Sequence, residues 1–293
     1  MKNDILPILL GATEGAYALS RAFYHDYGIR PLVLDEHSLP LLCKTDCARL
    51  LVRKNLSRPH ILFRVLEDIY EEEKGKNLLL IPVTEAYTER LREREAWLSS
   101  MFLLPHMPTL LEREEGGNPF ALLFLYRAED GAVRTAFGEI AAWANKAPAA
   151  ILARPTPHEL SDAVWGIAKD LSRGCYLFFL CEDENGETEL LSMGADFSPL
   201  SAMTFAHDVS IPELFITEQV LCDPLPESDG ELFGIFSLFS YHKTKRLVLP
   251  ALKKEYKQKR RRFTSLYSFG TEPFSFAMHR IFRSFYPRKK PKK

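Results

Sequence analysis

The sequence predicts an α/β protein in two parts, a parallel-sheet domain followed by an α+β domain on a largely antiparallel sheet. The first observation is an apolar run, a glycine turn, a helix and a second apolar run over residues 5–35. The second is a connector rich in Pro and Gly at residues 105–119, and the third is a pair of hairpin patterns beyond it. A strand–helix–strand unit requires parallel pairing, whereas a short turn between two strands favours antiparallel pairing.

The first unit has a strand at Ile5–Leu10, a turn at Gly11–Gly15 and a second strand at Pro31–Leu34. The helix between them has an apolar face made of Ala16, Leu19, Ala22 and Phe23. Backbone N–H groups and a helix N-terminus at such a turn favour a phosphate or a carboxylate. The spacing is Gly-x-x-x-Gly rather than Gly-x-Gly-x-x-Gly, and Glu14 would repel an anion. An ordinary tight turn and a ligand cradle therefore both stay open.

The alternation then continues with a strand at 48–52, a helix at 59–73, a strand at 78–82 and a helix from Thr84 or Thr88 to about Ser99. Open α/β sheets bind ligands at the carboxyl ends of their strands. We therefore expect any small-molecule site to use the residues at those ends, which are Gly11, Ala12, Thr13, Glu14, Gly15, Asp35, Thr84 and Glu85. Asp35 ends the second strand, where nucleotide-binding folds often keep an acid for a ribose.

The second part of the chain has an α+β pattern. Two hairpins are expected, from strands at 120–127 and 132–137 and from strands at 175–181 and 188–193, the latter joined through Asn185-Gly186. An Asn-Gly pair between apolar runs is a strong turn signal. The remaining pattern predicts a strand at 149–154 and helices at 157–172, 211–222, 247–262 and 275–286.

The net charge of −1 conceals an asymmetry along the chain. Residues 241–293 carry 17 Lys and Arg against two acids, a net +15, whereas residues 1–240 carry 21 against 37, a net −16. A basic block indicates an anionic partner, here a peripheral membrane surface in preference to nucleic acid, since no nucleic-acid module accompanies it. The alternatives are that the block neutralises the acidic body or is a solvated helix face. The helix that carries the phenylalanines of 274–285 could also dock on the body with that face buried. The candidate residues are Lys253, Lys254, Lys257, Lys259, Arg260, Arg261 and Arg262.

Composition and motifs further restrict the class of protein that this chain can be. An apolar content of 46% and a charged content of 26% are ordinary for a globular protein. No apolar run approaches the roughly 20 residues that span a bilayer, and the start of the chain lacks a secretory signal pattern. The five cysteines are scattered and odd in number, so we expect a reduced, cytoplasmic protein. Cys43-x-x-x-Cys47 could be half of a metal site, but no second Cys or His pair follows at a usable spacing, so no metal is expected. No nucleophile motif accompanies the eight histidines, so no catalytic residue is assigned.

Several segments in order resemble the N-terminal domain of the ATP-grasp carboxylate–amine ligases, most nearly the D-aspartate ligase group. These segments are residues 5–35, AYALSRAFYHDYGI within them, LLLIPVTEAYTERL and MFLLPH. The resemblance covers roughly the first 105 residues, and the order of elements from Phe120 onward resembles the second half of the ATP-grasp module. It implies a Rossmann-like pre-ATP-grasp domain at 1–105, a connector at 106–119, a truncated ATP-grasp-like domain at 120–240 and a basic helical region at 241–293.

The departures from that family concern the nucleotide and the metal. The family places its phosphate lysines and glycine-rich lid before the first hairpin, where this chain has only residues 105–119. Its metal ligands are an acid on the first strand of the second hairpin and a Glu-x-Asn on the second strand. Here Ser192 stands at the Glu position, Gly194 at the Asn position and Asp196 at that of a following Arg, and the facing strand offers Leu177, Phe178, Phe179 and Leu180.

We therefore expect a degenerate homologue, a pseudoenzyme with no cofactor, that binds a small ligand or a protein partner such as an intact ligase. The first alternative is an active ATP- and Mg²⁺-dependent carboxylate–amine ligase, in which Glu85, Asp196 or the basic helix replaces the lost groups. The second alternative is a protein that binds anionic surfaces through its basic C-terminal region.

Overall fold

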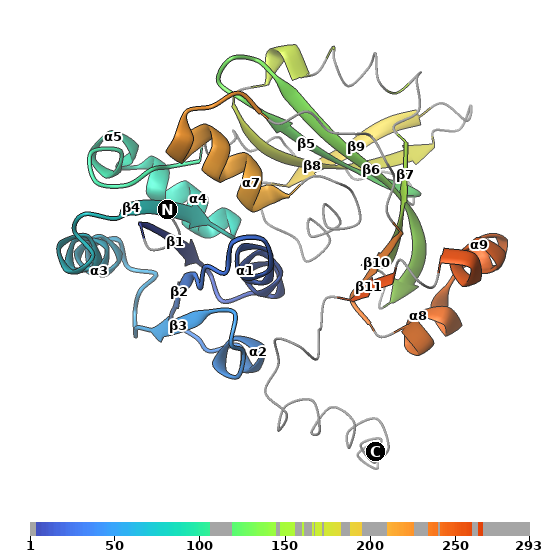
Figure 1. Cartoon of the computed structure of the whole chain (residues 1–293), viewed down its shortest axis with the longest axis horizontal. Helices are drawn as coiled ribbons and strands as arrows, with labels where there is room; N and C mark the ends of the chain where they lie inside the picture. The colour runs from blue at the N-terminus through green and yellow to red at the C-terminus, as the bar shows by residue number, and fades with distance from the viewer. Residues whose placement is uncertain are drawn as a thin grey trace.

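The structure is a computed structural model that describes residues 4–105, 119–144, 147–155, 160, 166, 168–171, 173–182, 188–194, 210–225, 234–239, 241–259 and 263–265. These residues form two separate sheets, one of four strands and one of seven (Figure 1). The first sheet is entirely parallel and the second is antiparallel except for one pair of short strands. The predicted α/β class, with a parallel part followed by an antiparallel part, is confirmed.

The parallel sheet has the strand order β3-β2-β1-β4. Its strands are β1 (Ile5–Leu10), β2 (Leu32–Asp35), β3 (Arg49–Val52) and β4 (Asn77–Pro82). An isolated parallel bridge joins Leu79 to Leu103 beyond β4. β1 is fully buried because helices cover both faces of the sheet, which explains its continuous apolar sequence.

Alternate residues of β1 serve two different cores. Ile5 and Leu9 pack with α1 (Glu14–Tyr27) and α2 (Pro40–Cys43). Leu6, Ile8 and Leu10 pack on the other side with α3 (Pro59–Glu72), α4 (Glu85–Arg92) and α5 (Glu95–Leu98). The single helix expected up to about Ser99 is therefore wrong: it is interrupted at Glu93 and Arg94, where two turn residues separate α4 from α5.

The antiparallel sheet has the order β11-β10-β7-β6-β5-β8-β9. Both predicted hairpins are present, with Arg127 paired to Val133 in the first and Glu182 paired to Thr188 in the second. The strands are β5 (Ala121–Arg127), β6 (Val133–Ala144), β7 (Ala147–Arg154), β8 (Gly174–Glu182), β9 (Thr188–Gly194), β10 (Ile235–Ser237) and β11 (Phe263–Ser265). The last two strands carried no prediction, because three-residue strands are too short to show an alternating pattern.

The segment from Ile211 to Leu221 lies between the two sheets (Figure 1). It begins as α7 (Ile211–Phe215) and continues as a π-helix (Ile216–Leu221) that ends at Cys222, where φ is 54°. Its buried residues join α1 and one face of the antiparallel sheet in a single core. The helix predicted at 211–222 is thus present, with wider hydrogen bonding in its second half.

The helix predicted at 247–262 is wrong. The chain forms α8 (Tyr241–Leu247), a 3₁₀ turn (Pro250–Leu252) and α9 (Lys253–Gln258), and Phe263–Ser265 is a strand. Pro250 lacks an N–H and so cannot continue a helix from the preceding residues. Of the helix predicted at 157–172, the described positions 160, 166 and 168–170 are helical, and the helix predicted at 275–286 lies outside the described residues.

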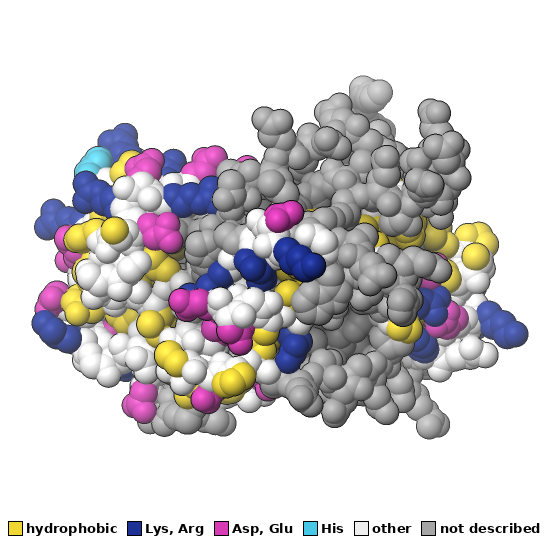
Figure 2. Space-filling view, turned by 90° about the horizontal axis from the view of Figure 1, so that it is seen from above, with side chains coloured by type: hydrophobic (Ala, Val, Ile, Leu, Met, Phe, Trp, Pro, Cys, Tyr) yellow, Lys and Arg dark blue, Asp and Glu magenta, His cyan; other side chains and the backbone are white. Residues whose placement is uncertain are grey.

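No helix in the described part of the chain combines the length and the apolar character needed to cross a membrane. On the face drawn in Figure 2, acidic and basic side chains are interspersed over the described surface. That face therefore presents no extended area of one charge among the described residues.

Candidate functional site

The glycine turn after β1 depends on a backbone conformation that favours glycine. Gly11 has φ of +113°, and its N–H donates to the carbonyl of Leu34 at 2.9 Å. A Cβ at Gly11 would stand 3.0 Å from Cγ2 of Thr84 and 3.7 Å from Cδ2 of Tyr87. The turn is therefore packed directly against the residues that follow β4, which brings the ends of β1 and β4 together.

Thr13 caps the helix that begins at the turn. Its Oγ1 accepts a hydrogen bond from the N–H of Ala16 at 3.1 Å, which satisfies one of the N–H groups left without a partner in the first turn of a helix. Glu14 is exposed and Gly15 is buried. The amides at this end of α1 are thus partly satisfied by the protein's own side chains.

Asp35 at the end of β2 reaches across to the glycine turn. Its Oδ2 accepts from the N–H of Ala12 at 2.5 Å, and its Oδ1 accepts from the N–H groups of Glu36 at 2.5 Å and His37 at 3.3 Å. The carboxylate therefore occupies an amide that a bound anion would use.

The end of β4 carries Thr84 and Glu85. Thr84 occupies the N-cap position of α4 without a side-chain capping bond, its carbonyl accepts from the N–H groups of Tyr87 and Thr88, and Glu85 is exposed. The structure thus gathers Gly11, Ala12, Asp35 and Thr84 at one edge of the parallel sheet. Whether that edge binds a ligand stays a prediction.

Two residues at this edge were not predicted. Glu36 accepts a hydrogen bond from the N–H of Ser57, and hydrogen bonding from Ser57 lowers the pKa of its carboxyl. Burial raises the pKa of Tyr87, and the charges of Asp35 and Glu36 raise it further, while Arg90 opposes them. Tyr87 lies three residues after Thr84, so its helical spacing from the end of β4 was the signal that could have found it.

A second polar cluster lies on the antiparallel sheet, where the π-helix meets β5 and β8. Glu218 is only 9% exposed and accepts from the hydroxyl of Tyr126 and, at 2.6 Å, from the N–H of Glu129. Nε of Arg173 lies 3.3 Å from Oε1 of Glu218. Burial raises the pKa of Tyr126, with Cys175 and Glu218 adding to the effect. No local pattern predicts this cluster, because its members are up to 92 positions apart.

No protein-family model matches the sequence, and no curated protein matches it. Solved structures do match it. N5-carboxyaminoimidazole synthetase from Staphylococcus aureus matches with a TM-score of 0.56 and 10% identity, over 87% of this chain and 86% of that one.

Two nucleotide complexes match similarly. Biotin carboxylase from Campylobacter jejuni, solved with β,γ-ATP, has a TM-score of 0.53 and 12% identity over 78% of this chain and 74% of its own. Carboxyaminoimidazole ribonucleotide synthase from Aspergillus clavatus, solved with ATP, matches with a TM-score of 0.53 and 11% identity, over 80% of this chain and 81% of that one. This chain has the ATP-grasp ligase fold. Identities this low establish the fold and leave activity to be argued from the residues.

Within the ATP-grasp fold, the β8–β9 hairpin is the place where the resemblance expects metal ligands. The register pairs Ser192 with Phe179 and Gly194 with Leu177, and Asp196 lies outside the described residues. Leu177 is 4% exposed, so the apolar side chain paired with Gly194 is itself buried. Among the described residues, no three His, Cys, Asp or Glu side chains are grouped closely enough to share a metal ion.

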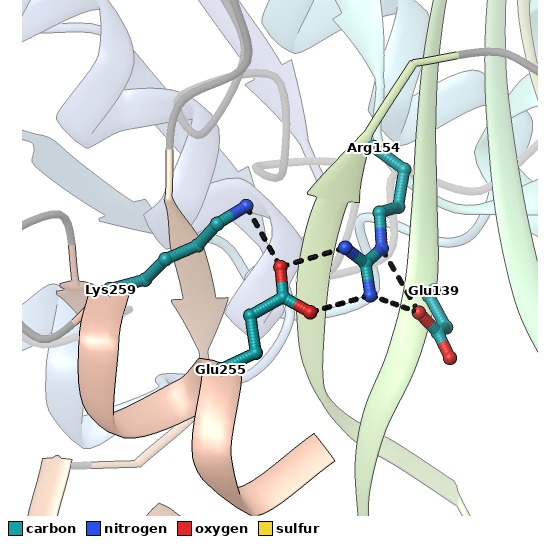
Figure 3. Close-up of polar contacts among 4 residues, drawn as sticks. All are labelled: Glu139, Arg154, Glu255 and Lys259. Atoms are coloured by element: carbon teal, nitrogen blue, oxygen red, sulfur yellow. Dashed lines mark hydrogen bonds and ion pairs between the residues drawn. The ribbon is translucent and has the colours of Figure 1, made fainter. Parts of the chain in front are cut away.

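The basic segment of the ATP-grasp chain is docked on the antiparallel sheet through α9. Leu252 and Tyr256 are buried in a core with residues of β6, β7 and β10. Lys259 lies 3.2 Å from Glu255, which also pairs with Arg154 (Figure 3). Lys253, Lys254 and Lys257 are exposed, and residues 260–262 lie outside the described residues. A docked helix is present over 253–258, and three of the four candidate lysines among the described residues are exposed. The phenylalanine-bearing helix that was expected to dock lies outside the described residues.

Proposed function

We propose that this protein is an ATP-grasp-fold protein that does not catalyse ligation and instead binds a small ligand or a protein partner, with the ligand at the carboxyl edge of its parallel sheet. The observation that carries the proposal is the β8–β9 hairpin. ATP-grasp ligases pass through an acyl phosphate, whose developing phosphoryl charge must be stabilised by Mg²⁺ and lysines. Mg²⁺ binds oxygen ligands, mainly carboxylates, and neither Ser192 nor Gly194 supplies a carboxylate.

The length of the connection between the sheets also supports the proposal. Leu103 bridges to the parallel sheet and Ala121 begins β5, so residues 104–120 must join the two sheets. A segment of that length is too short for a subdomain with its own strands and a glycine-rich lid. In this proposal, the phosphate-clamping groups that the family keeps in that interval are missing from this chain.

Isothermal titration with ATP and Mg²⁺ tests the proposal. We expect no saturable heat at micromolar nucleotide concentrations, whereas micromolar binding would overturn it. The ligase alternative predicts ADP release that depends on an added amino acid. If release is seen, Glu85→Gln should abolish it, and Glu89→Gln, which removes an equally exposed charge one turn along α4, should not.

A second function is favoured by one observation on α9. Lys253, Lys254 and Lys257 are spaced to lie on one face of the helix, and all three are exposed while Tyr256 is buried. Such a face can bind anionic lipid headgroups.

Co-sedimentation with phosphatidylserine vesicles tests this function. Replacing the three lysines by alanine should reduce binding at low salt, and high salt should reduce it for the parent protein. Replacing the exposed Lys54, Lys74 and Lys76 by alanine is the control matched in charge. Equal loss in both variants would indicate non-specific charge attraction and count against the surface.

A further inference from the structure

The corner between α8 and α9 carries positive charge that the protein itself does not neutralise. Residues 241–259 contain seven Lys and Arg against one Glu, a net +6. That one acid, Glu255, is paired with Arg154 and Lys259. The other six cations are exposed, and within the described residues none of them forms an ion pair; they are Lys243, Lys245, Arg246, Lys253, Lys254 and Lys257.

An apolar tip, formed by Leu249, Pro250 and Ala251, lies between these cations in the chain. Leu249 is 39% exposed, and Pro250 and Ala251 are also exposed. Arg246 precedes Leu249 by three positions, and Lys253 follows it by four. A single exposed leucine needs no explanation. This one, however, stands between two helices whose exposed charged side chains are all positive.

The backbone fixes the apolar tip against the antiparallel sheet. The N–H of Leu249 donates to the carbonyl of Ala141 on β6 at 2.9 Å, and the carbonyl of Leu249 accepts from the N–H of Leu252 at 3.0 Å. Val248 and Leu252 are both buried in the core that they share with β6, β7 and β10. Because the tip is already ordered, its insertion into an apolar phase would lose little conformational entropy.

The exposed side chains of the corner favour a lipid surface over a nucleic acid. Non-specific binding of single strands relies on aromatic rings that stack on the bases, and in this segment Tyr256 is buried and Tyr241 partly buried. Lysines beside a leucine suit an anionic bilayer, because the lysines meet headgroups while the leucine reaches the acyl chains. Residues 1–240 carry 21 Lys and Arg against 37 acids, a net −16, so an anionic surface repels the body and attracts this corner.

We propose that the α8–α9 corner binds a bilayer that contains anionic phospholipids, with the six cations on the headgroups and Leu249 inserted among the acyl chains. This inference rests on the proposed lipid-binding function of α9. It deepens that function by adding the cations of α8, by assigning the apolar tip as the inserted part and by fixing which end of the molecule faces the bilayer.

Binding of the full chain to mixed phosphatidylserine and phosphatidylcholine vesicles tests the insertion. Leu249→Ala should weaken binding about fivefold, because it removes three carbons that would enter the apolar phase. Leu221→Ala is the matched control, since Leu221 is 40% exposed but lies on the π-helix. The control should bind as the parent does.

A second variant locates the side chain in the bilayer. In vesicles with brominated acyl chains, the fluorescence of the tryptophan added by Leu249→Trp should be quenched. Leu221→Trp should show no quenching beyond that of the parent, which has three tryptophans of its own. This measurement also serves if Leu249→Ala disturbs the corner.

The opposite outcomes overturn the inference in distinguishable ways. Unchanged binding of Leu249→Ala, or no added quenching in Leu249→Trp, would refute insertion and leave the lysine face of α9 in place. Unchanged binding after replacement of Lys253, Lys254 and Lys257 would refute the lipid-binding function, and the inference with it. Binding to single-stranded DNA without binding to vesicles would assign the corner to a nucleic acid and likewise refute it. The proposed lack of catalysis is tested separately, by the titration with ATP and Mg²⁺.

Discussion

Arg154 on β7 donates two hydrogen bonds to Glu255 on α9, from Nη1 to Oε1 at 2.7 Å and from Nη2 to Oε2 at 2.8 Å, across 101 positions of sequence. Nε and Nη2 of the same guanidinium donate to Oε2 of Glu139 on β6 at 3.0 and 2.7 Å. A planar guanidinium suits this double arrangement. The network drawn in Figure 3 therefore links α9 to β6 and β7 of the antiparallel sheet.

The first prediction concerns Glu255 and acid stability. Burial acts to raise the pKa of Glu255, but hydrogen bonds from Arg154 and Lys259 outweigh it and lower the pKa below the ordinary 4.5. A lowered carboxyl pKa contributes stability that is present above the unfolded value and is lost as pH falls below it. Glu255→Gln should cost about 1 kcal/mol at neutral pH. The difference from the parent in urea unfolding should shrink below pH 4.5, and a difference independent of pH would contradict the assignment.

The second prediction concerns the Tyr126–Glu218 pair. Tyr126→Phe removes a buried donor to Glu218 and should cost about 1–2 kcal/mol. Glu218→Gln should cost about 2–3 kcal/mol because Arg173 loses the more buried of its two carboxylate partners, Glu129 remaining. The two changes should not be additive, since both alter the contact between Tyr126 and Glu218. Denaturant unfolding of both single variants and the double variant measures the coupling. Fully additive losses would show that the two side chains act independently.

The third prediction concerns Gly11. Gly11→Ala should destabilise the protein by about 2–3 kcal/mol, through the strained positive φ and the 3.0 Å approach to Cγ2 of Thr84. Gly75→Ala is the matched control, because Gly75 has φ of +98° with no atom within 4 Å of the added Cβ. The loss of stability in Gly75→Ala should come from the positive φ alone and so be smaller than that in Gly11→Ala. Thr84→Ser removes the Cγ2 methyl that the added Cβ would meet. The double variant should therefore regain part of the melting temperature that Gly11→Ala loses in thermal unfolding.

The fourth prediction concerns Tyr27 at the end of α1. Burial raises the pKa of Tyr27 from 10.0 to about 12, with the charges of Glu213 and Asp26 adding to the effect. Its unfolded value is lower than its folded value, so its contribution to stability is complete below pH 10 and is lost as pH rises toward 12. Tyr27→Phe should make the alkaline decrease in stability shallower over that interval. Tyr24→Phe, one turn away, is the control.

Much of the fold follows from local pattern. The continuous apolar strands β1 and β4, the glycine turn and the Asn-Gly hairpin each depend on residues near one another in sequence, so hydrophobic period and turn chemistry predict them. Prediction failed where a local rule was overlooked or the element was very short. The predicted helix at 247–262 contains Pro250, which cannot continue a helix from the preceding residues. β10 and β11 have three residues each, too few to show a period.

The sequence by itself determined which sheet is parallel, where the hairpins turn and which residues stand at the carboxyl ends of strands. Only the tertiary structure decided that Asp35 bonds to Ala12, that the charges of Asp35 and Glu36 act on Tyr87 and that Glu218 meets Tyr126. Periodicity reflects backbone hydrogen bonding between near neighbours, whereas these contacts join side chains brought together by packing. Their partners lie 23 to 92 positions apart, a separation over which no local pattern carries information.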